Sequence, residues 1–139
     1  MRLFVGLDLP WETRQRLALL GGKGIPGAKW VPMENYHLTL RFIGDVEGHL
    51  ADEIANALDR VRRPPFSLAL SGVGAFGSKK PHSIYAGVTA SPDLNALQAE
   101  IDRICQRLGV PSDPRKFVPH VTLARLKNSS DNEVARYLS

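Results

Sequence analysis

The tetrapeptide His-x-Thr-Leu occurs twice in the chain, as HLTL at 37–40 and as HVTL at 120–123. Side chains alternate between the two faces of a strand, so His37 and Thr39 point to one face and the two leucines point to the other. The second copy has the same alternation. Each copy therefore predicts a strand with an apolar face and a face that carries one imidazole and one hydroxyl.

The flanks of the two copies match as well. A proline precedes each copy, at Pro32 and Pro119, and an arginine follows each, at Arg41 and Arg125. Each half also contains a long segment with amphipathic helical spacing. We therefore interpret the halves as copies of one unit. If a pseudo-twofold axis relates them, their polar strand faces line one groove with four side chains: His37, Thr39, His120 and Thr122.

Two opposed imidazoles suit a reaction in which one group removes a proton while the other delivers one, because both forms of histidine exist near neutral pH. Phosphodiester cleavage has this requirement, and threonine hydroxyls can donate hydrogen bonds to phosphate oxygens as negative charge develops. The chain has 18 basic and 14 acidic residues, a net charge of +4. This basic excess favours a polyanionic partner such as RNA.

Predicted strands and helices alternate, which indicates an α/β or α+β fold. Strands are expected at 3–7, 37–43, 66–70 and 83–89 and through the second motif, and helices at 11–20, from Asp45 through Val61, from Ser91 to Gly109 and from 131 to 138. The segment 72–82, rich in glycine and basic residues, is expected to be a loop.

Two other chemistries fit the residues less well. Paired histidines bind zinc in many proteins, but neither motif has the third and fourth ligands that zinc sites need, so no metal site is expected. The single cysteine, Cys105, has helical core spacing and excludes an internal disulfide. No signal peptide or membrane-spanning segment is predicted, and we expect a cytoplasmic protein.

Four segments together resemble the two-histidine (2H) phosphoesterases, in particular the bacterial and archaeal RNA 2′,3′-cyclic phosphodiesterases, also called 2′–5′ RNA ligases. They are FVGLDLP (4–10), WVPMENYHLTLRFIGDV (30–46), PHSIYAGV (81–88) and RKFVPHVTLAR (115–125). The resemblance implies an α+β, bilobal, pseudo-twofold-symmetric fold with two antiparallel sheets and outer helices around a central cleft. It also implies that residues 1–139 form one domain of two intertwined lobes, truncated at the C-terminus relative to the family.

For function, the resemblance implies metal-independent and cofactor-independent hydrolysis of RNA 2′,3′-cyclic phosphate ends, or of nucleoside 2′,3′-cyclic phosphates, to 2′-phosphates. Reversible 2′–5′ joining of tRNA halves is a second activity of some members. A monomer is expected. A catalytically idle RNA-end binding module, and a phosphodiesterase of a small cyclic nucleotide such as ADP-ribose 1″,2″-cyclic phosphate, remain alternatives.

Matched residue by residue, the resemblance makes His37 and His120 catalytic, and we assign His120 as base and His37 as acid. Thr39, Thr122 and Arg125 are expected to bind phosphate. Arg125 lies five residues after His120, so it reaches the histidine's face only if the strand bends or ends.

Further substrate contacts are expected from residues beside the first motif. Arg41, four residues after His37, is expected on the histidine's face, and Tyr36 and Phe42 are candidates to stack on a base.

Overall fold

The structure, a computed structural model, describes residues 1–21, 24–77 and 79–139. Its elements in chain order are β1 (Arg2–Asp8), α1 (Trp11–Ala18), β2 (Ala28–Trp30), the 3₁₀ turn η1 (Met33–Asn35), β3 (His37–Asp45), α2 (Gly48–Leu58), β4 (Leu70–Phe76), β5 (Ser83–Val88), α3 (Pro92–Arg107), β6 (His120–Leu126) and α4 (Asp131–Leu138). The α+β prediction is confirmed, and the pairs β2–β6, β3–β6, β4–β5 and β5–β6 are antiparallel.

The chain forms two compact units that interleave along the sequence. The first unit comprises Met1–Gly6, Thr39–Leu68 and Ala90–Pro119, and the second unit comprises Leu7–Leu38, Ala69–Thr89 and His120–Ser139. Strands β1 and β3 each contribute residues to both units.

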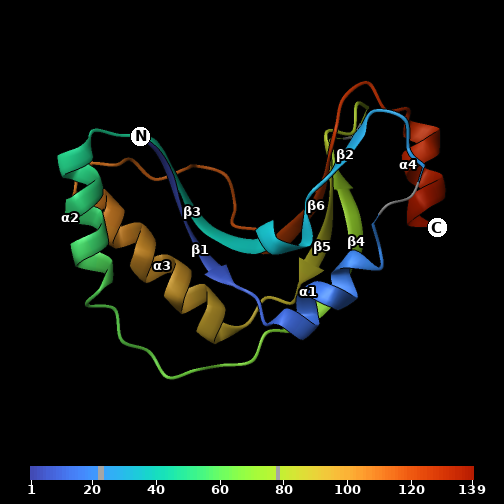
Figure 1. Cartoon of the computed structure of the whole chain (residues 1–139). Coiled ribbons are helices and arrows are strands. Elements are labelled where there is room, and N and C mark those ends of the chain that lie inside the picture. The colour runs from blue at the N-terminus through green and yellow to red at the C-terminus, as the bar shows by residue number, and fades with distance from the viewer. Residues whose placement is uncertain (22–23, 78) are drawn as a thin grey trace. The chain divides into compact units, whose positions relative to one another are not determined.

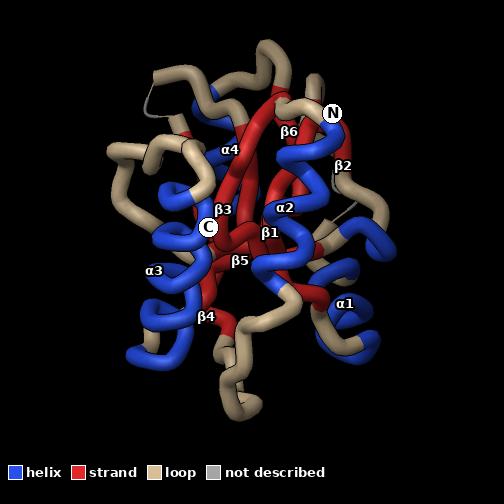
Figure 2. Tube along the Cα trace, turned by 90° about the vertical axis from the view of Figure 1, so that its left-hand side faces the viewer, coloured by secondary structure: helices blue, strands red, loops and turns tan. Residues whose placement is uncertain are grey.

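In the first unit, helices α2 and α3 lie side by side along the hydrogen-bonded strands β1 and β3 (Figures 1 and 2). Helix α3 begins where the hydroxyl of Ser91 accepts a hydrogen bond from the Leu94 N–H at 3.1 Å, with Pro92 at the first helical position. It ends before Gly109, whose φ of +94° favours glycine. The buried side chains of the two helices are Ile54, Leu94, Leu97, Ile101 and Cys105.

The second unit contains the start of β3 followed by its neighbours β6, β5 and β4, and β2 pairs with residues 124–126 of β6. Helix α4 contacts β4 (Figure 1), and α1 contacts η1. The fully buried large side chains of this unit are Leu17, Leu38, Ile84, Val121 and Leu123. They come from one helix and three strands, so the core holds the two motif strands against each other.

Because β3 belongs to both units, the strands form one hydrogen-bonded order, β1-β3-β6-β5-β4, instead of two separate sheets. A single long strand can pair with β1 in its later part and with β6 at its start. The pseudo-twofold relation and the central cleft stay predictions.

The prediction of a strand at 66–70 and a loop at 72–82 is wrong for 66–69, which form no strand, and for 72–76, which form one; residues 77 and 79–82 lie outside the strands, as predicted. Strand β4 begins at Leu70 and runs through this segment to Phe76, while Ser78 lies outside the described residues. Gly74 allows close packing: a Cβ added there would lie 2.6 Å from the hydroxyl oxygen of Tyr85. Tyr85, on the paired strand β5, thus covers a position where β4 has no side chain.

The start of α2 also differs from the prediction. Glu47, not Asp45, is the residue before the helix, and the helix ends at Leu58. Asp45 instead accepts a hydrogen bond from the terminal ammonium group of Met1 at 2.7 Å. This ion pair lowers the pKa of the Asp45 carboxyl below its usual value.

Candidate active site

The starts of the two motif strands, at His37 and at His120, are neighbours within the second unit. Strands β3 and β6 pair antiparallel, with Leu38 opposite Val121. The next pair in this register has His37 opposite Thr122. Directly opposite Cβ atoms in such a pair are about 4.5–5.5 Å apart, and diagonal ones about 7–8 Å. His37 and His120 are diagonal neighbours in this register.

The burial of these residues shows which face they share. Leu38 and Val121 are fully buried, whereas the histidines and Thr122 are half-buried. The structure therefore brings His37, His120 and Thr122 together on the more open face of two adjacent strands. Thr39 is also half-buried and lies two residues after His37 on β3, at the start of the first unit's second segment.

The ring of His37 contacts the turn that precedes its strand. Its Nδ1 lies 2.9 Å from the carbonyl oxygen of Asn35, the last residue of η1. A carbonyl oxygen only accepts, so this contact is a hydrogen bond when Nδ1 carries a proton. Nε2 then accepts a proton in the neutral ring and donates one in the charged ring, which leaves it suited to exchange protons with a substrate.

The ring of His120 packs against two aromatic rings that the sequence analysis did not identify. Phe76 of β4 lies edge-on to it at 4.9 Å between ring centroids, and Tyr85 of β5 lies edge-on at 5.6 Å. Phe76 and Tyr85 stack on each other at 4.4 Å. Such edge contacts contribute about 0.5–1.5 kcal/mol beyond area burial, so they hold the imidazole in one orientation. Strand alternation around Tyr85 was the one signal in the sequence that could have indicated the face of this ring. The structure adds the register, in which Tyr85 lies opposite Thr122.

Arg125 reaches the face of Thr122 through a β-bulge. On β6, Thr122 pairs with Tyr85 and Ala124 pairs with Ile84, so Leu123 is an extra residue in this strand. The bulge shifts the alternation by one position, and Arg125, opposite Ser83, shares the face of Tyr85 and Thr122. This is the bend that the prediction for Arg125 required. Its phosphate-binding role stays a prediction.

The prediction that Arg41 contacts substrate is wrong. Its side chain is only 5% exposed, and its Nε donates to Asp102 Oδ1 at 2.7 Å within the first unit. The guanidinium also donates to the carbonyl oxygens of Phe42, Val110 and Pro111 at 2.5, 3.1 and 2.5 Å. Its donors are committed to a structural network that anchors the loop after α3.

The two predicted aromatic contacts have different outcomes. Tyr36 is 4% exposed, so its ring cannot be offered to a base, and burial raises the pKa of its hydroxyl. Phe42 is 50% exposed and belongs to the first unit, where the guanidinium of Arg2 lies over its ring at 5.7 Å. A contact between Phe42 and substrate stays a prediction.

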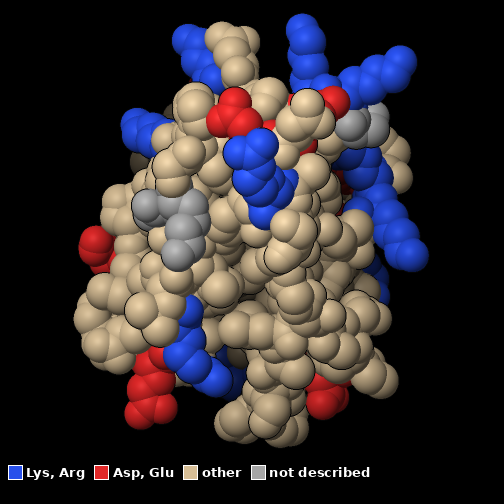
Figure 3. All heavy atoms as spheres, turned by 90° about the vertical axis from the view of Figure 1, so that its right-hand side faces the viewer, with Lys and Arg blue, Asp and Glu red and all other residues tan. Residues whose placement is uncertain are grey.

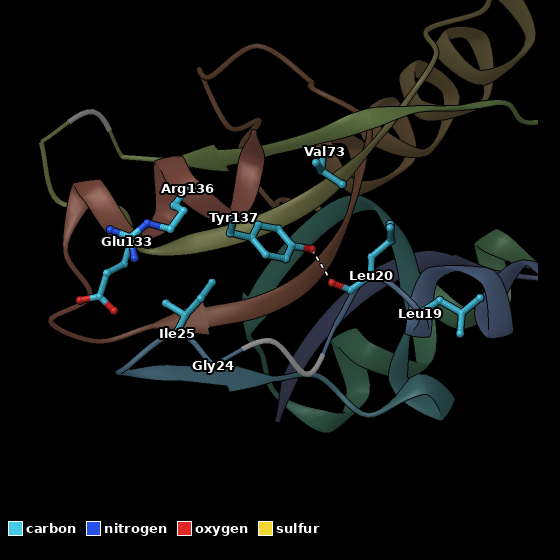
Figure 4. A pocket seen from close by; sticks show the side chains of 8 residues that line it. All are labelled: Leu19, Leu20, Gly24, Ile25, Val73, Glu133, Arg136 and Tyr137. Atoms are coloured by element: carbon cyan, nitrogen blue, oxygen red, sulfur yellow. Dashed lines mark hydrogen bonds between the residues drawn. The ribbon is translucent and has the colours of Figure 1, made fainter.

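A separate cavity of about 490 Å³ lies in the second unit (Figure 4). It is lined by Leu19, Leu20, Gly24, Ile25, Val73, Glu133, Arg136 and Tyr137. The Tyr137 hydroxyl donates to the Leu20 carbonyl oxygen at 2.6 Å, which links α4 to the end of α1. The lining contains none of the motif residues, so this cavity is distinct from the candidate active site.

Three further features bear on the chemistry. Within residues 1–21, 24–77 and 79–139, no group of three or more His, Cys, Asp or Glu side chains is arranged to hold a metal ion. Cys105 is fully buried in α3, as predicted, and burial raises the pKa of its thiol. No helix in the described part of the chain is long and apolar enough to cross a membrane.

Comparison with known proteins agrees with this geometry. The family model described as LigT like Phosphoesterase matches residues 7–85 and 88–139. The chain therefore belongs to the LigT-like phosphoesterase family. A relative from Geobacillus stearothermophilus named RNA 2′,3′-cyclic phosphodiesterase is 36% identical over 88% of this chain, and one from Aeropyrum pernix with the same name is 39% identical over 76%. The chain spans only 41% and 61% of the lengths of these two relatives.

Solved structures show the same fold. A crystal structure of a Thermus thermophilus protein has a TM-score of 0.79 at 30% identity, and the match covers 91% of this chain and 75% of that one. Escherichia coli LigT in its apo form has a TM-score of 0.77 at 29% identity, and the match covers 94% and 73%. Further structures of that protein are described as complexes with 3′-AMP and with phosphate.

Proposed function

We propose that this chain hydrolyses RNA 2′,3′-cyclic phosphate ends to 2′-phosphates without a metal ion. The observation that carries the proposal is the diagonal placement of His37 and His120 on adjacent antiparallel strands. The names of the relatives support the substrate, and the complexes of E. coli LigT with 3′-AMP and with phosphate support a nucleotide as ligand. The proposal also includes a cytoplasmic monomer, with tRNA halves among its RNA substrates.

In the proposed mechanism, water attacks the phosphorus in line with the bond to the 3′-oxygen. His120 removes a proton from the water as the new P–O bond forms. His37 donates a proton to the 3′-oxygen as the P–O3′ bond breaks. The product is a 2′-phosphate with a free 3′-hydroxyl, and each histidine ends in the opposite protonation state, which solvent exchange restores.

The negative charge that develops on the non-bridging oxygens needs hydrogen-bond donors. Thr122 lies opposite His37 in the register, and Thr39 follows His37 on the same side of β3. We assign both hydroxyls to these oxygens, with the Arg125 guanidinium as a further cationic donor. The surface seen in Figure 3 carries many Lys and Arg side chains along its upper edge, and such a surface attracts RNA.

The test is turnover of nucleoside 2′,3′-cyclic phosphates in EDTA, with the product identified as the 2′- or 3′-phosphate. The variants His37→Ala and His120→Ala are each expected to lower kcat by about 10²–10⁴-fold, the usual contribution of one acid or base. The matched control is His49→Ala, because the His49 side chain is 74% exposed and lies in α2 of the first unit. It should leave kcat unchanged.

Three results would contradict the proposal. Full activity of His37→Ala or of His120→Ala would contradict the paired-histidine mechanism. Release of the 3′-phosphate would contradict the assigned direction of attack. Binding of cyclic nucleotides without turnover by the wild-type chain would favour an RNA-end binding module instead.

A further inference from the structure

A second hollow, of about 290 Å³, lies in the first unit between the end of α2 and the later turns of α3. Figure 2 shows these two helices side by side. Three arginines, Arg60, Arg103 and Arg107, line the hollow, and we call it the arginine pocket. The apolar part of its lining comes from Ala57, Val61 and Ile104.

The arginine pocket is lined by three cationic side chains and one acidic side chain. Its one acidic lining residue, Glu100, already accepts a hydrogen bond from Arg63 Nε at 2.7 Å. Arg60, Arg103 and Arg107 are exposed, and none of them forms an ion pair with any residue that the structure describes.

The helix geometry strengthens the repulsion between these cations. Arg103 and Arg107 are four residues apart on α3 and therefore lie on one helical face, where like charges destabilise a helix. The negative end of the helix dipole favours a cation in the last turn, which accounts for Arg107. That effect fades one turn earlier and does not account for Arg103. A bound anion would relieve the repulsion among all three groups.

We propose that the arginine pocket binds a phosphodiester group of an RNA strand. A guanidinium group can donate two parallel hydrogen bonds to the oxygens of one phosphate, and several guanidinium groups around one hollow can share a phosphate. A volume of about 290 Å³ is at the small end of ligand pockets, which suits a phosphate and part of its sugar. The inference rests on the proposed function in taking RNA as the polyanion, but it uses none of the residues of the candidate active site.

The experiment compares two double variants that remove the same charge from exposed helical positions. Arg103→Gln/Arg107→Gln removes two of the three positive charges that line the pocket. The matched control, Arg16→Gln/Arg136→Gln, changes α1 and α4 of the second unit, where both arginines are exposed. Binding of a fluorescent single-stranded RNA of about 12 nucleotides, within the range that single-strand binding sites cover, is measured by anisotropy across a salt series. Circular dichroism confirms that each variant is folded.

The pocket variant should bind the RNA at least about tenfold more weakly, and its salt slope should fall by about 0.7, the value for one lost phosphate contact on a single strand. The control should change the affinity less than about twofold. Equal losses in both variants, or no loss in the pocket variant, would overturn the inference. Titration with inorganic phosphate, followed by NMR shifts of α3 amides, separates the two sources: shifts at micromolar phosphate would identify a free-anion site and refute the backbone role.

Turnover of a nucleoside 2′,3′-cyclic phosphate distinguishes this inference from the proposed function. The mononucleotide has no further phosphodiester, so the pocket variant should turn it over at the wild-type rate. Normal turnover with unchanged RNA binding would refute the arginine pocket and leave the proposed function intact. Absent turnover in the wild type with selective loss of RNA binding in the pocket variant would refute the proposed function and support the pocket.

Discussion

Replacing Asp102 with asparagine tests the interpretation of Arg41 as a structural residue. The side chain of Arg41 is only 5% exposed, and its ion partner, Asp102, is 19% exposed. Asparagine keeps the shape of the side chain but leaves the buried cation with only neutral carbonyl partners. Breaking a buried ion pair in this way lowers the free energy of unfolding by about 3–5 kcal/mol. Asp102 is partly exposed and the asparagine amide can still accept a hydrogen bond, so we expect a loss of about 2–3 kcal/mol.

The pH dependence gives a sharper signature. Burial alone would raise the pKa of Asp102, but hydrogen bonds from Ser112, Arg41 and Gln106 outweigh it and hold the pKa below its ordinary value of 3.8. A carboxyl with a lowered folded-state pKa stabilises the fold above its unfolded pKa, and the stabilisation is lost as the pH falls through the folded value. The stability difference between wild type and Asp102→Asn should therefore be full near neutral pH and shrink below pH 3.8.

The assay is thermal and urea unfolding followed by circular dichroism at neutral pH and at a series of acidic values. The expected loss corresponds to a Tm lower by roughly 8–12 °C for a chain of this size. The matched control is Asp113→Asn, in the loop that follows α3, whose carboxyl pairs with the exposed Arg115 at 2.7 Å and has a pKa of about 2. Its unfolding midpoint at neutral pH should stay close to wild type. Equal midpoints for both variants would refute the role of Arg41 as a buried anchor.

Two further predictions concern the second unit. Phe76→Leu removes the edge contact on His120 and should lower kcat about tenfold, equivalent to about 1.4 kcal/mol. Phe4→Leu, at a phenylalanine of β1 that is 48% exposed, is the control and should leave kcat unchanged; equal activities of the two variants would show that the Phe76 ring does not position the imidazole. Tyr137→Phe removes the hydrogen bond to the Leu20 carbonyl and should lower the free energy of unfolding by about 1 kcal/mol in urea titrations, and an unchanged free energy would show that this bond does not stabilise the fold.

Local patterns were sufficient where a residue's environment depends on its immediate neighbours. The extent of α3 between Ser91 and Gly109 was predicted, and so was the core position of Cys105. Strand alternation likewise predicted that Leu38 and Val121 would be buried while His37 and His120 would be more open. These features follow from helical and strand periodicity, which act over a few residues.

Features that depend on distant partners could not be predicted. The alternation rule put Arg41 on the open face. In the structure its side chain is buried instead, because it binds the loop carbonyls and the carboxylate of Asp102, which is 61 residues away in sequence. The same rule put Arg125 on the wrong face, because it could not anticipate the extra residue Leu123 that the pairing of β6 with β5 creates.

The sequence by itself determined the two motif strands, their polar and apolar faces and the family to which the chain belongs. Only the tertiary structure decided that the strands are antiparallel neighbours with His37 opposite Thr122, and that Phe76 and Tyr85 enclose His120. The physical reason is range: side-chain alternation is a property of one strand, whereas register, bulges and ring contacts arise when separate strands share hydrogen bonds and a common core.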